Sequence, residues 1–227
     1  MTQYSIDAGM CKFVARAEDA AITKLTQLHF MDTWWPEDPS KFSRVGKVSD
    51  LSSLIFFKEK RDGKLKSRHC VNGSPQREYI SKEEAASPTV ATESVFTTAA
   101  ISAFEKRFNR TFDIPSAFVN TDSDENVLMV LKDDMAEMMV KIAPNIYRKH
   151  IITNSKGRPI LYVRLRKMLF RLLCSALFFY MKLRYEIEVD GSVVNPCVAN
   201  KTIEKGDKIT VIWHVDDLMV SCKDDLQ

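Results

Sequence analysis

Two adjacent aspartates, Asp216 and Asp217, lie between two apolar runs of strongly β-prone residues. The runs are Ile209–Val215 and Leu218–Val220. Two strands joined by so short a polar insert indicate a hairpin with the carboxylates at its tip. A carboxylate pair on a fixed turn is a good ligand for a divalent cation, because hard cations prefer carboxylate oxygen. Two other Asp-Asp pairs occur, at 133–134 and 224–225, but only this pair has a strand on both sides.

A third carboxylate, Asp113, lies in the short apolar segment Phe112–Phe118. Two-metal phosphoryl transfer needs carboxylates from separate elements, which hold two ions about 4 Å apart. One ion activates the attacking hydroxyl, and both stabilise the charge that develops. Asp113, Asp216 and Asp217 would supply that set, so we expect them to converge although about a hundred residues separate them. The alternative interpretation of Asp113 is an ordinary aspartate at a strand end.

Charge alternates along the chain although its net value is only +3. From Lys141 to Arg184 there are eleven Lys or Arg and no Asp or Glu. From Lys58 to Lys82 there are eight Lys or Arg and three Asp or Glu. Seven acids and one Lys lie from Asp113 to Glu137. Folded together, such blocks can form a positive groove around a carboxylate cluster. Solvated faces that happen to differ in sign are the alternative.

The composition favours an ordinary globular protein of one or one and a half domains, with 227 residues of which 45% are hydrophobic. Its five cysteines form no CxxC pair, which argues against a disulfide framework or a zinc ribbon and for a reducing compartment. The longest apolar run, Met168–Met181, is too short for a membrane span and contains Arg171. We therefore expect an intracellular protein, cytoplasmic or nuclear.

Hydrophobic periodicity predicts an α+β fold, with an antiparallel sheet and packed helices. Helices are expected at 13–31, 87–107, 133–142 and 174–186. In the second of these we expect Val90, Ile101 and Phe104 to point inward. A strand is expected at 51–57, and a second strand follows it and ends at 71. Further strands are expected at 111–119, 127–131, 160–165, 198–202, 208–215 and 218–222.

Six segments, in this order along the chain, resemble the reverse transcriptases of copia-type LTR retrotransposons. F-F-K-E-K-R-D-G-K-L-K-S-R (56–68) is similar to the fingers hairpin of that family, and S-P-T-V (87–90) lies where it has A-P-V-V. D-I-P-S-A-F-V-N-T-D (113–122) resembles D-V-K-N-A-F-L-x-G-D, and L-Y-V-R-L-R-K-M-L-F (161–170) resembles V-C-R-L-K-K-A-L-Y-G. N-P-C-V (195–198) resembles D-P-C-V, and H-V-D-D-L-M-V (214–220) is similar to Y-V-D-D-I-L-I. The ordered series is specific, whereas no single motif is.

The resemblance implies an RNA-directed DNA polymerase domain of a Pol polyprotein, which adds deoxynucleotides to a primer 3′-hydroxyl with two Mg²⁺ ions, or Mn²⁺. Its implied partners are an RNA or DNA template with primer and deoxynucleoside triphosphates, and no membrane partner is implied. The implied location is a cytoplasmic virus-like particle or the nucleus. The oligomeric state stays open. The implied organisation is a partly helical linker at 1–49, fingers at 50–112 and a palm at 113–227.

The resemblance also assigns roles to the acidic residues and to one aromatic ring. Asp113 matches the first metal-binding aspartate of the palm, and Asp216 and Asp217 match the paired aspartates of the catalytic hairpin. Phe118 matches the ring that lies under the sugar and leaves no room for a 2′-hydroxyl, which selects deoxynucleotides. An ordinary core phenylalanine is the alternative for Phe118.

Basic residues receive two roles from the resemblance. Three on the fingers hairpin would grip the incoming triphosphate, since guanidinium and ammonium groups suit phosphate oxygens: Lys60, Lys66 and Arg68. Three in the basic block would face the template and primer backbone, where affinity is electrostatic: Arg164, Arg166 and Lys167. For each residue of the hairpin, a solvated surface charge is the alternative.

Some features depart from the family. Arg171 replaces the Gly of L-Y-G in a segment that approaches the templating base, and His214 replaces the Tyr of Y-V-D-D. The sequence stops ten residues after Asp217, so a palm truncated after the catalytic hairpin is expected, without thumb or RNase H domain. We expect no polymerisation by this chain alone. A retroelement remnant that at most binds nucleic acid is the second interpretation, and an unrelated metal-binding α+β domain is the third.

Overall fold

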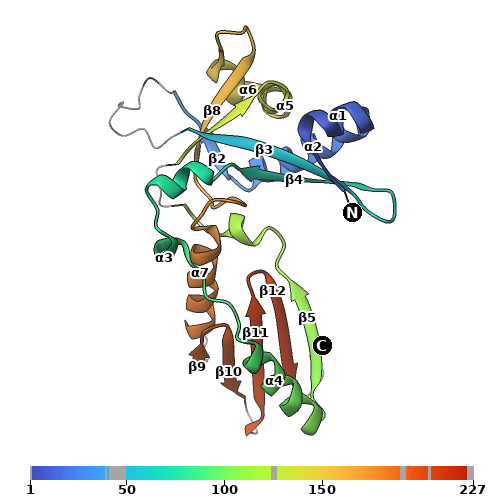
Figure 1. Ribbon diagram of the computed structural model, residues 1–227, viewed down its shortest axis with the longest axis vertical. Helices are drawn as coiled ribbons and strands as arrows, with labels where there is room; N and C mark the ends of the chain where they lie inside the picture. The colour runs from blue at the N-terminus through green and yellow to red at the C-terminus, as the bar shows by residue number, and fades with distance from the viewer. Residues whose placement is uncertain are drawn as a thin grey trace. The chain divides into compact units, whose positions relative to one another are not determined.

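A computed structural model describes residues 2–38, 40, 50–123, 127–189, 193–203 and 206–223 (Figure 1). The chain divides into two compact units, and each unit is built from two stretches of sequence. Unit 1 comprises Met1–Ser81 and Asp122–Leu173, and unit 2 comprises Lys82–Thr121 and Cys174–Gln227. The contiguous division expected at 112/113 does not coincide with these units, because each unit is completed by a stretch from the other half of the chain.

Unit 1 contains a seven-stranded sheet in which β3 and β8 are the branching strands. Strand β3 pairs with β1, β4 and β6, and β8 pairs with β6, β2 and β7. The strands are β1 (Gln3–Ser5), β2 (Trp34–Pro36), β3 (Leu51–Glu59), β4 (Leu65–Val71), β6 (Leu128–Lys132), β7 (Ile151–Thr153) and β8 (Pro159–Leu165).

One strand pair of unit 1 departs from the antiparallel sheet expected from the sequence. Strands β3 and β6 are parallel, with Leu51 opposite Met129 and Ser52 opposite Val130. A parallel pair needs a long connection, whereas a hairpin enforces the antiparallel arrangement. The chain leaves unit 1 after Ser81 and returns at Asp122, so no short turn constrains this pair.

Helices α1 (Ile6–Phe13) and α2 (Ala15–Phe30) occupy the stretch for which a partly helical linker was expected. The predicted helix at 13–31 is confirmed in α2, although Val14, with φ 43°, separates α2 from α1. Four residues at helical spacing turn one stripe of α2 into the core: Ala17, Ala21, Leu25 and Leu28. Helix α2 packs on β4, and residues 41–49 of the expected linker lie outside the described residues.

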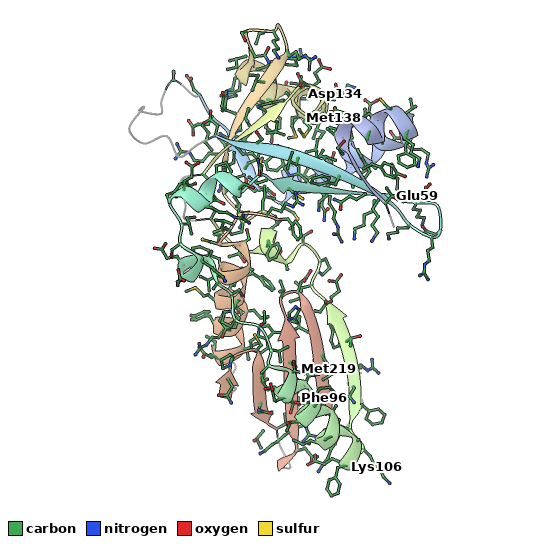
Figure 2. The ribbon with its side chains drawn as sticks, viewed as in Figure 1. Glu59, Phe96, Lys106, Asp134, Met138 and Met219 are labelled. Atoms are coloured by element: carbon green, nitrogen blue, oxygen red, sulfur yellow. The ribbon has the colours of Figure 1, made fainter. Side chains whose placement is uncertain are left out.

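Three of the remaining helices of unit 1 follow β6 along the chain: α5 (Asp134–Ile142), α6 (Pro144–Tyr147) and the 3₁₀ helix η5 (Arg148–His150). A further 3₁₀ helix, η3 (Ser74–Glu78), follows β4. The methionine-rich helix predicted at 133–142 is confirmed as α5, which buries Met135, Met138 and Met139. Figure 2 labels Met138 and Asp134 on this helix. Within the described part of the chain, no helix has the length and apolar character needed to cross a membrane.

Unit 2 is built on a five-stranded antiparallel sheet with strand order β5-β12-β11-β10-β9 (Figure 1). The strands are β5 (Phe108–Asp113), β9 (Val193–Asn195), β10 (Val198–Thr202), β11 (Lys208–His214) and β12 (Asp217–Cys222). The helices are α3 (Lys82–Ala85), α4 (Thr92–Phe104), α7 (Ser175–Val189) and the 3₁₀ helix η4 (Ala117–Asn120). Strand β5 forms one edge of the sheet.

Strand alternation gives this sheet two chemically different faces. The register of β5, β12 and β11 places one set on what we call the carboxylate face: Asn109, Thr111, Asp113, Thr210, Ile212, His214, Asp217, Met219 and Ser221. The opposite set forms the apolar face: Phe108, Arg110, Phe112, Val211, Trp213, Leu218, Val220 and Cys222. Helix α7 packs on the apolar face, where its Tyr180 joins a buried cluster with Ala199 and Trp213.

Helix α4 differs from its prediction in both its length and its orientation. It spans 92–104 rather than 87–107, and the extended Ala91 precedes it. Its buried residues are Thr98 and Ser102, whereas Ile101 is 42% and Phe104 90% exposed, so the expected inward orientation was wrong for these two. Val90, which precedes the helix, does pack inward, against the buried cluster around Trp213. Helix α4 lies against the carboxylate face, where Ser102 Oγ and Ser221 Oγ are 2.6 Å apart. Its polar side chains meet a sheet face on which Thr210 and Ser221 are buried beside Ile212.

The strand predicted at 111–119 is shorter than expected and begins earlier. Strand β5 ends at Asp113, and η4 begins at Ala117. Two residues between them account for the break: Pro115 has no backbone N–H to donate, and Ser116 adopts a left-handed conformation with φ 54°. The other predicted strands and helices are present within a few residues of their expected bounds.

Candidate active site

Two of the three aspartates expected to converge, Asp113 and Asp217, are brought together by the pairing of β5 with β12. Asp113 lies directly opposite Asp217 in the register of the two strands. Directly opposed residues of an antiparallel pair have Cβ atoms about 5 Å apart on the same face of the sheet. The backbone N–H of Ile114 donates to the carbonyl oxygen of Asp216 at 3.2 Å, which extends the pairing to the turn. The sequence-distant carboxylates therefore meet on the carboxylate face.

Asp216 lies in the two-residue turn that joins β11 to β12, as the hairpin motif predicted. The other turn residue, Val215, has φ 57°. A β-branched residue in the left-handed region is a genuine outlier, since its side chain crowds the backbone there. Backbone strain of this kind is often located at functional sites. The turn next to Asp217 is thus a strained element of the hairpin.

A hollow of about 430 Å³ borders the two opposed carboxylates. Asp113 and Asp217 line it together with His214, and Val95 of α4 contributes to its wall. Among the residues that the structure describes, no three His, Cys, Asp or Glu side chains converge closely enough to form a metal site. The arrangement thus offers two opposed carboxylates and an adjoining space rather than a closed cage.

Phe118 lies on η4, the 3₁₀ helix that follows β5. Its ring packs edge-to-face against Phe179 of α7, with centroids 6.1 Å apart. Phe118 is half-buried, whereas its neighbours Ala117 and Val119 are buried. This packing is what the core interpretation of Phe118 predicts.

The triphosphate-gripping residues predicted from the fingers hairpin belong to unit 1. Lys60 follows β3, and Lys66 and Arg68 lie on β4. Lys66 is paired with Lys58, and Arg68 with Phe56, so these four residues share one face of the β3–β4 hairpin. The guanidinium of Arg171 lies 4.9 Å from the centre of the Phe56 ring. We call Lys58, Lys66, Arg68 and Arg171 the cationic hairpin face.

The cationic hairpin face has no compensating acid among the described residues, since no ion pair there involves any of its four members. Lys58 directly opposite Lys66 is a repulsive arrangement. The same positive field acts on neighbouring groups: burial and then Lys66 lower the pKa of Lys24, and Arg171 and Arg68 oppose the rise that burial causes in the pKa of Cys70. A face of this kind suits a phosphate-bearing ligand.

The hairpin turn beside this face is held by helix α2. Arg16 of α2 forms an ion pair with Glu59 at 3.3 Å and donates to the carbonyl oxygen of Gly63 at 2.5 Å. Figure 2 labels Glu59, the last residue of β3. Lys58 was not among the residues singled out from the sequence. Strand alternation could have found it, because Lys58, Lys66 and Arg68 all fall at alternate positions of two strands joined by a short turn.

Arg171, which replaces the family's glycine, has φ 76°. Left-handed conformations cost a non-glycine residue roughly 1–2 kcal/mol. Both Arg171→Ala and Arg171→Gly lose the guanidinium above Phe56, but only glycine removes the backbone strain. We therefore expect the Gly variant to be more stable than the Ala variant by about 1 kcal/mol in urea unfolding.

A matched pair at Asp19, an exposed residue inside α2, provides the control for this comparison. In a helix interior, glycine is less favourable than alanine by about 1 kcal/mol. Asp19→Gly should therefore be less stable than Asp19→Ala, which is the opposite order. Equal stabilities of the two Arg171 variants would show that the strain at this position is relieved in solution.

Each of the three residues expected to face template and primer is ion-paired within unit 1. Arg164 Nε lies 3.0 Å from Glu37, Arg166 Nη1 2.6 Å from Asp32, and Lys167 Nζ 2.5 Å from Asp122. The acidic partners lie outside the basic block in sequence, so the charge count alone could not reveal them. Exposed ion pairs contribute about 0–1 kcal/mol, so a phosphate could displace these carboxylates at modest cost.

This difference in pairing predicts a difference in salt dependence. Each phosphate contact contributes about 0.7–0.9 to the slope of log affinity against log salt concentration. Replacing Lys58, Lys66 and Arg68 together by Ala should flatten the slope for a primer–template by about 2. Replacing Arg164, Arg166 and Lys167 together should flatten it by less than about 1, since their charges are already balanced. Fluorescence anisotropy at several salt concentrations measures both slopes.

An affinity that does not change with salt would exclude electrostatic binding by either set. A larger effect from the second triple variant would contradict the role that we assign to the ion pairs. The two triple substitutions remove equal charge from the same unit, so each serves as the control for the other.

The carboxylate pair belongs to unit 2 and the cationic hairpin face to unit 1. The first is assembled by a sheet register and the second by one hairpin together with Arg171. No protein-family model matches this chain.

Proposed function

We propose that this chain provides the fingers and palm of an RNA-directed DNA polymerase of the copia type, acting on a primer–template and deoxynucleoside triphosphates. The observation that carries the proposal is the β5–β12 register, which sets Asp113 opposite Asp217. The ordered series of motifs supports it, as does the cationic hairpin face. In this proposal the carboxylates hold Mg²⁺ or Mn²⁺, and the hairpin cations hold phosphate.

The carboxylates fit the requirements of a divalent cation bound with its substrate. Mg²⁺ usually keeps several waters and binds through one or two carboxylates together with substrate phosphates, so a closed protein cage is not required. Asp113 and Asp217 supply two opposed carboxylates, whereas Asp216, on the adjoining turn, does not complete a group of three with them. When bound, such ions polarise the phosphoryl oxygens and lower the pKa of the attacking hydroxyl.

The residues of this chain would contribute position and electrostatics. Asp113 and Asp217 would fix the place of the reacting phosphoryl group on the carboxylate face. Lys66 and Arg68 would neutralise phosphate on the cationic hairpin face of unit 1, because phosphoryl transfer depends almost wholly on positioning and charge stabilisation. Phe118 would exclude a 2′-hydroxyl.

A remnant that only binds nucleic acid is the second candidate. Two observations favour it: Arg171 occupies a left-handed position that suits glycine, and no set of three metal-binding side chains converges among the described residues. The remnant would keep the cationic hairpin face but lack a working metal site.

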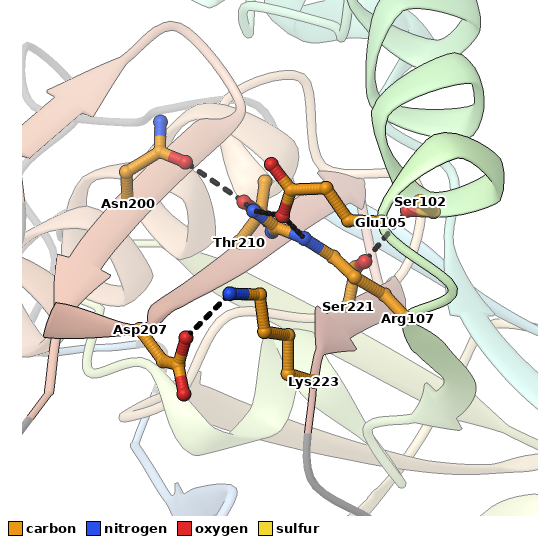
Figure 3. Close-up of polar contacts among 8 residues, drawn as sticks. All are labelled: Ser102, Glu105, Arg107, Asn200, Asp207, Thr210, Ser221 and Lys223. Atoms are coloured by element: carbon orange, nitrogen blue, oxygen red, sulfur yellow. Dashed lines mark hydrogen bonds and ion pairs between the residues drawn. The ribbon is translucent and has the colours of Figure 1, made fainter. Parts of the chain in front are cut away.

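The test is the Mn²⁺-dependent binding of a fluorescent deoxynucleoside triphosphate. Asp113→Asn and Asp217→Asn should each weaken this binding at least tenfold, about 1.4 kcal/mol. Asp207→Asn is the matched control, since Asp207 lies in the same unit in an ion pair with Lys223 (Figure 3). Binding that neither site variant weakens would place the metal elsewhere and contradict the proposal.

Mn²⁺-dependent nucleotide binding separates the two candidates, because we expect no primer extension by this chain alone. Primer extension is measured beside it, with Asp217→Asn as the blank. Extension clearly above the blank identifies a polymerase. Salt-sensitive binding of primer–template without Mn²⁺-dependent nucleotide binding identifies the remnant.

A further inference from the structure

Strand β5 leaves one edge of the unit 2 sheet open along its whole length (Figure 1). Among the described strands it pairs with β12 alone, and all of its residues are exposed. An edge strand presents a row of backbone N–H and C=O groups to which another strand can bind. Proline or a β-bulge commonly protects such an edge. Between Phe108 and Asp113, β5 contains no proline, and its one-to-one pairing with β12 contains no bulge.

The hydrogen bonds between β5 and β12 fix which backbone groups face the open edge. The N–H of Ile114 donates to the carbonyl oxygen of Asp216 at 3.2 Å, so these two residues form a hydrogen-bonded pair. Hydrogen-bonded and non-hydrogen-bonded pairs alternate along an antiparallel ladder. Asn109, Thr111 and Asp113 therefore belong to the non-hydrogen-bonded pairs, and their N–H and C=O groups point away from β12. Within the described part of the chain, no other backbone group bonds to these three residues on that side.

A second copy of β5 can meet this edge in an antiparallel arrangement with its twofold axis at Thr111. The outward groups of Thr111 then bond to Thr111 of the partner subunit. Those of Asn109 bond to Asp113 of the partner subunit, and those of Asp113 bond to the partner's Asn109. Each of these pairs exchanges both of its backbone hydrogen bonds. The outward groups of β5 are thus complementary to a second copy of themselves.

The side chains also agree with this register, on both faces of the sheet. On the carboxylate face Asn109 lies opposite the partner's Asp113, so an amide N–H can donate to a carboxylate oxygen. On the apolar face Arg110 lies opposite the partner's Phe112, and a guanidinium packs favourably on an aromatic ring. Phe112 is 47% exposed in the single chain, so this pairing removes ring surface from water.

Two neighbouring registers also align the outward backbone groups, and both are less favourable. A twofold axis at Arg110 places two guanidinium groups directly opposite each other, which is repulsive. A twofold axis at Phe112 places Asn109 opposite the partner's Pro115, which has no backbone N–H to donate. Of these three registers, the one centred on Thr111 combines complete backbone pairing with complementary side chains.

We propose that β5 is a self-association surface, on which a second copy of this chain extends the unit 2 sheet by antiparallel β5–β5 pairing centred on Thr111. The partner's Asn109 then lies beside Asp113, so the second copy contributes a side chain next to one of the two opposed carboxylates. The inference rests on the open edge and its register, and it does not depend on the proposed function. One short strand pair buries less surface than a standard interface, so we expect a dissociation constant of roughly 10–100 µM.

Sedimentation velocity at concentrations from about 1 to about 300 µM measures this association. Asn109→Asp places two carboxylates opposite each other at both ends of the pairing and should weaken the dimer about tenfold. Asn109→Lys should strengthen it about threefold, because an ammonium group then lies opposite each Asp113. Opposite effects of two substitutions at one exposed residue distinguish strand pairing from a loss of folding.

The matched controls are Asn195→Asp and Asn195→Lys on β9, the strand at the other edge of the same sheet. Neither should change the dissociation constant, although they change the net charge by the same amounts. A parent chain that stays monomeric over the whole range would overturn the proposal. An equal response to substitution at Asn109 and at Asn195 would also overturn it, because the association would then depend on net charge.

A short thiol-specific cross-linker tests the register. The background variant is Cys11→Ser, which removes the exposed native thiol among the described cysteines. Thr111→Cys should cross-link into a dimer at least about fivefold faster than Asn109→Cys, because only position 111 lies opposite itself. The two copies of position 109 are offset by four residues, or about 13 Å along the strands. Faster cross-linking at position 109 would show that the edges pair in another register and would overturn the proposal.

Discussion

At pH 5 the free energy of unfolding is expected to be about 2 kcal/mol lower than at pH 7.5 because of one buried imidazole, that of His69. His69 is 3% exposed, and its pKa is lowered from 6.5 to about 3. Burial is the larger cause, and the nearby Lys24 is the second. The folded protein therefore holds this histidine neutral over the range in which an unfolded chain protonates it.

The surroundings of His69 explain why protonation is so unfavourable. Its Nε2 lies 2.7 Å from Ser53 Oγ, which also lies 3.3 Å from the Met135 sulfur. Its Nδ1 is buried without a hydrogen-bond partner among the described residues. Trp34 packs against the ring with centroids 5.3 Å apart. A proton on Nδ1 would place a buried charge beside these groups with no acceptor for its N–H.

The direction of the effect follows from which state binds the proton. Below pH 6.5 the unfolded chain binds a proton that the folded chain refuses until about pH 3, so stability falls as the pH decreases through this window. Above pH 6.5 the imidazole is mostly neutral in both states, so this loss of stability is absent. At pH 5, which is about 1.5 pH units below the pKa of 6.5 in the unfolded chain, the free energy of unfolding is lower by about 2 kcal/mol.

Urea unfolding of His69→Gln and of the parent chain at both pH values measures this contribution. The variant should lose about 2 kcal/mol less than the parent between pH 7.5 and pH 5. His150→Gln, which removes another histidine of unit 1, should retain the fall seen in the parent. An identical pH dependence of parent and His69→Gln would show that His69 is protonated in the folded protein.

Gly73→Ala is expected to destabilise unit 1 by about 3 kcal/mol. A Cβ at this position would lie 2.1 Å from the backbone carbonyl oxygen of Arg171, and a backbone atom cannot rotate away as a side chain can. The backbone of Gly73 itself is unstrained, with φ −77°, so the cost is steric alone. The segment is held in place by the Val71 N–H, which donates to the carbonyl oxygen of Phe170 at 3.0 Å.

Gly63→Ala provides the contrast in the same unit. No atom lies within 4 Å of a Cβ there, but φ is +77°, so alanine should cost only about 1–2 kcal/mol through its backbone. Chemical denaturation of both variants separates the steric from the conformational cost. A Gly73 variant no less stable than the Gly63 variant would mean that the 171 segment shifts to accept the methyl group.

The β11–β12 hairpin and its aspartates were predictable because their determinants are local. Alternating apolar residues on both sides of a short polar insert specify two strands and a turn, and they place Asp216 and Asp217 at the tip. The convergence of Asp113 was predictable only through the chemistry that would need it. The sheet register that produces it joins residues 104 positions apart, from 113 to 217, and no local pattern encodes such a pairing.

The ionic environment of the basic residues could not be read from charge counts. Arg164, Arg166 and Lys167 find their acidic partners in segments far from the basic block, whereas Lys66 and Arg68 find none among the described residues. Ion pairing depends on distances of a few ångströms between segments. Those distances are set by sheet topology, including the parallel β3–β6 pair that the sequence did not predict.

By itself the sequence determined the α+β class, most strands and helices, and the chemistry that the aspartates could perform. Only the tertiary structure decided where α4 lies. Apolar residues occur on several sides of this helix, at Val95, Phe96, Ile101 and Phe104, so no single stripe specifies an inward face. Its docking position is therefore set by the sheet face that it meets. Because the two faces of the sheet differ in chemistry, the periodicity of such a helix cannot by itself predict on which face the helix packs.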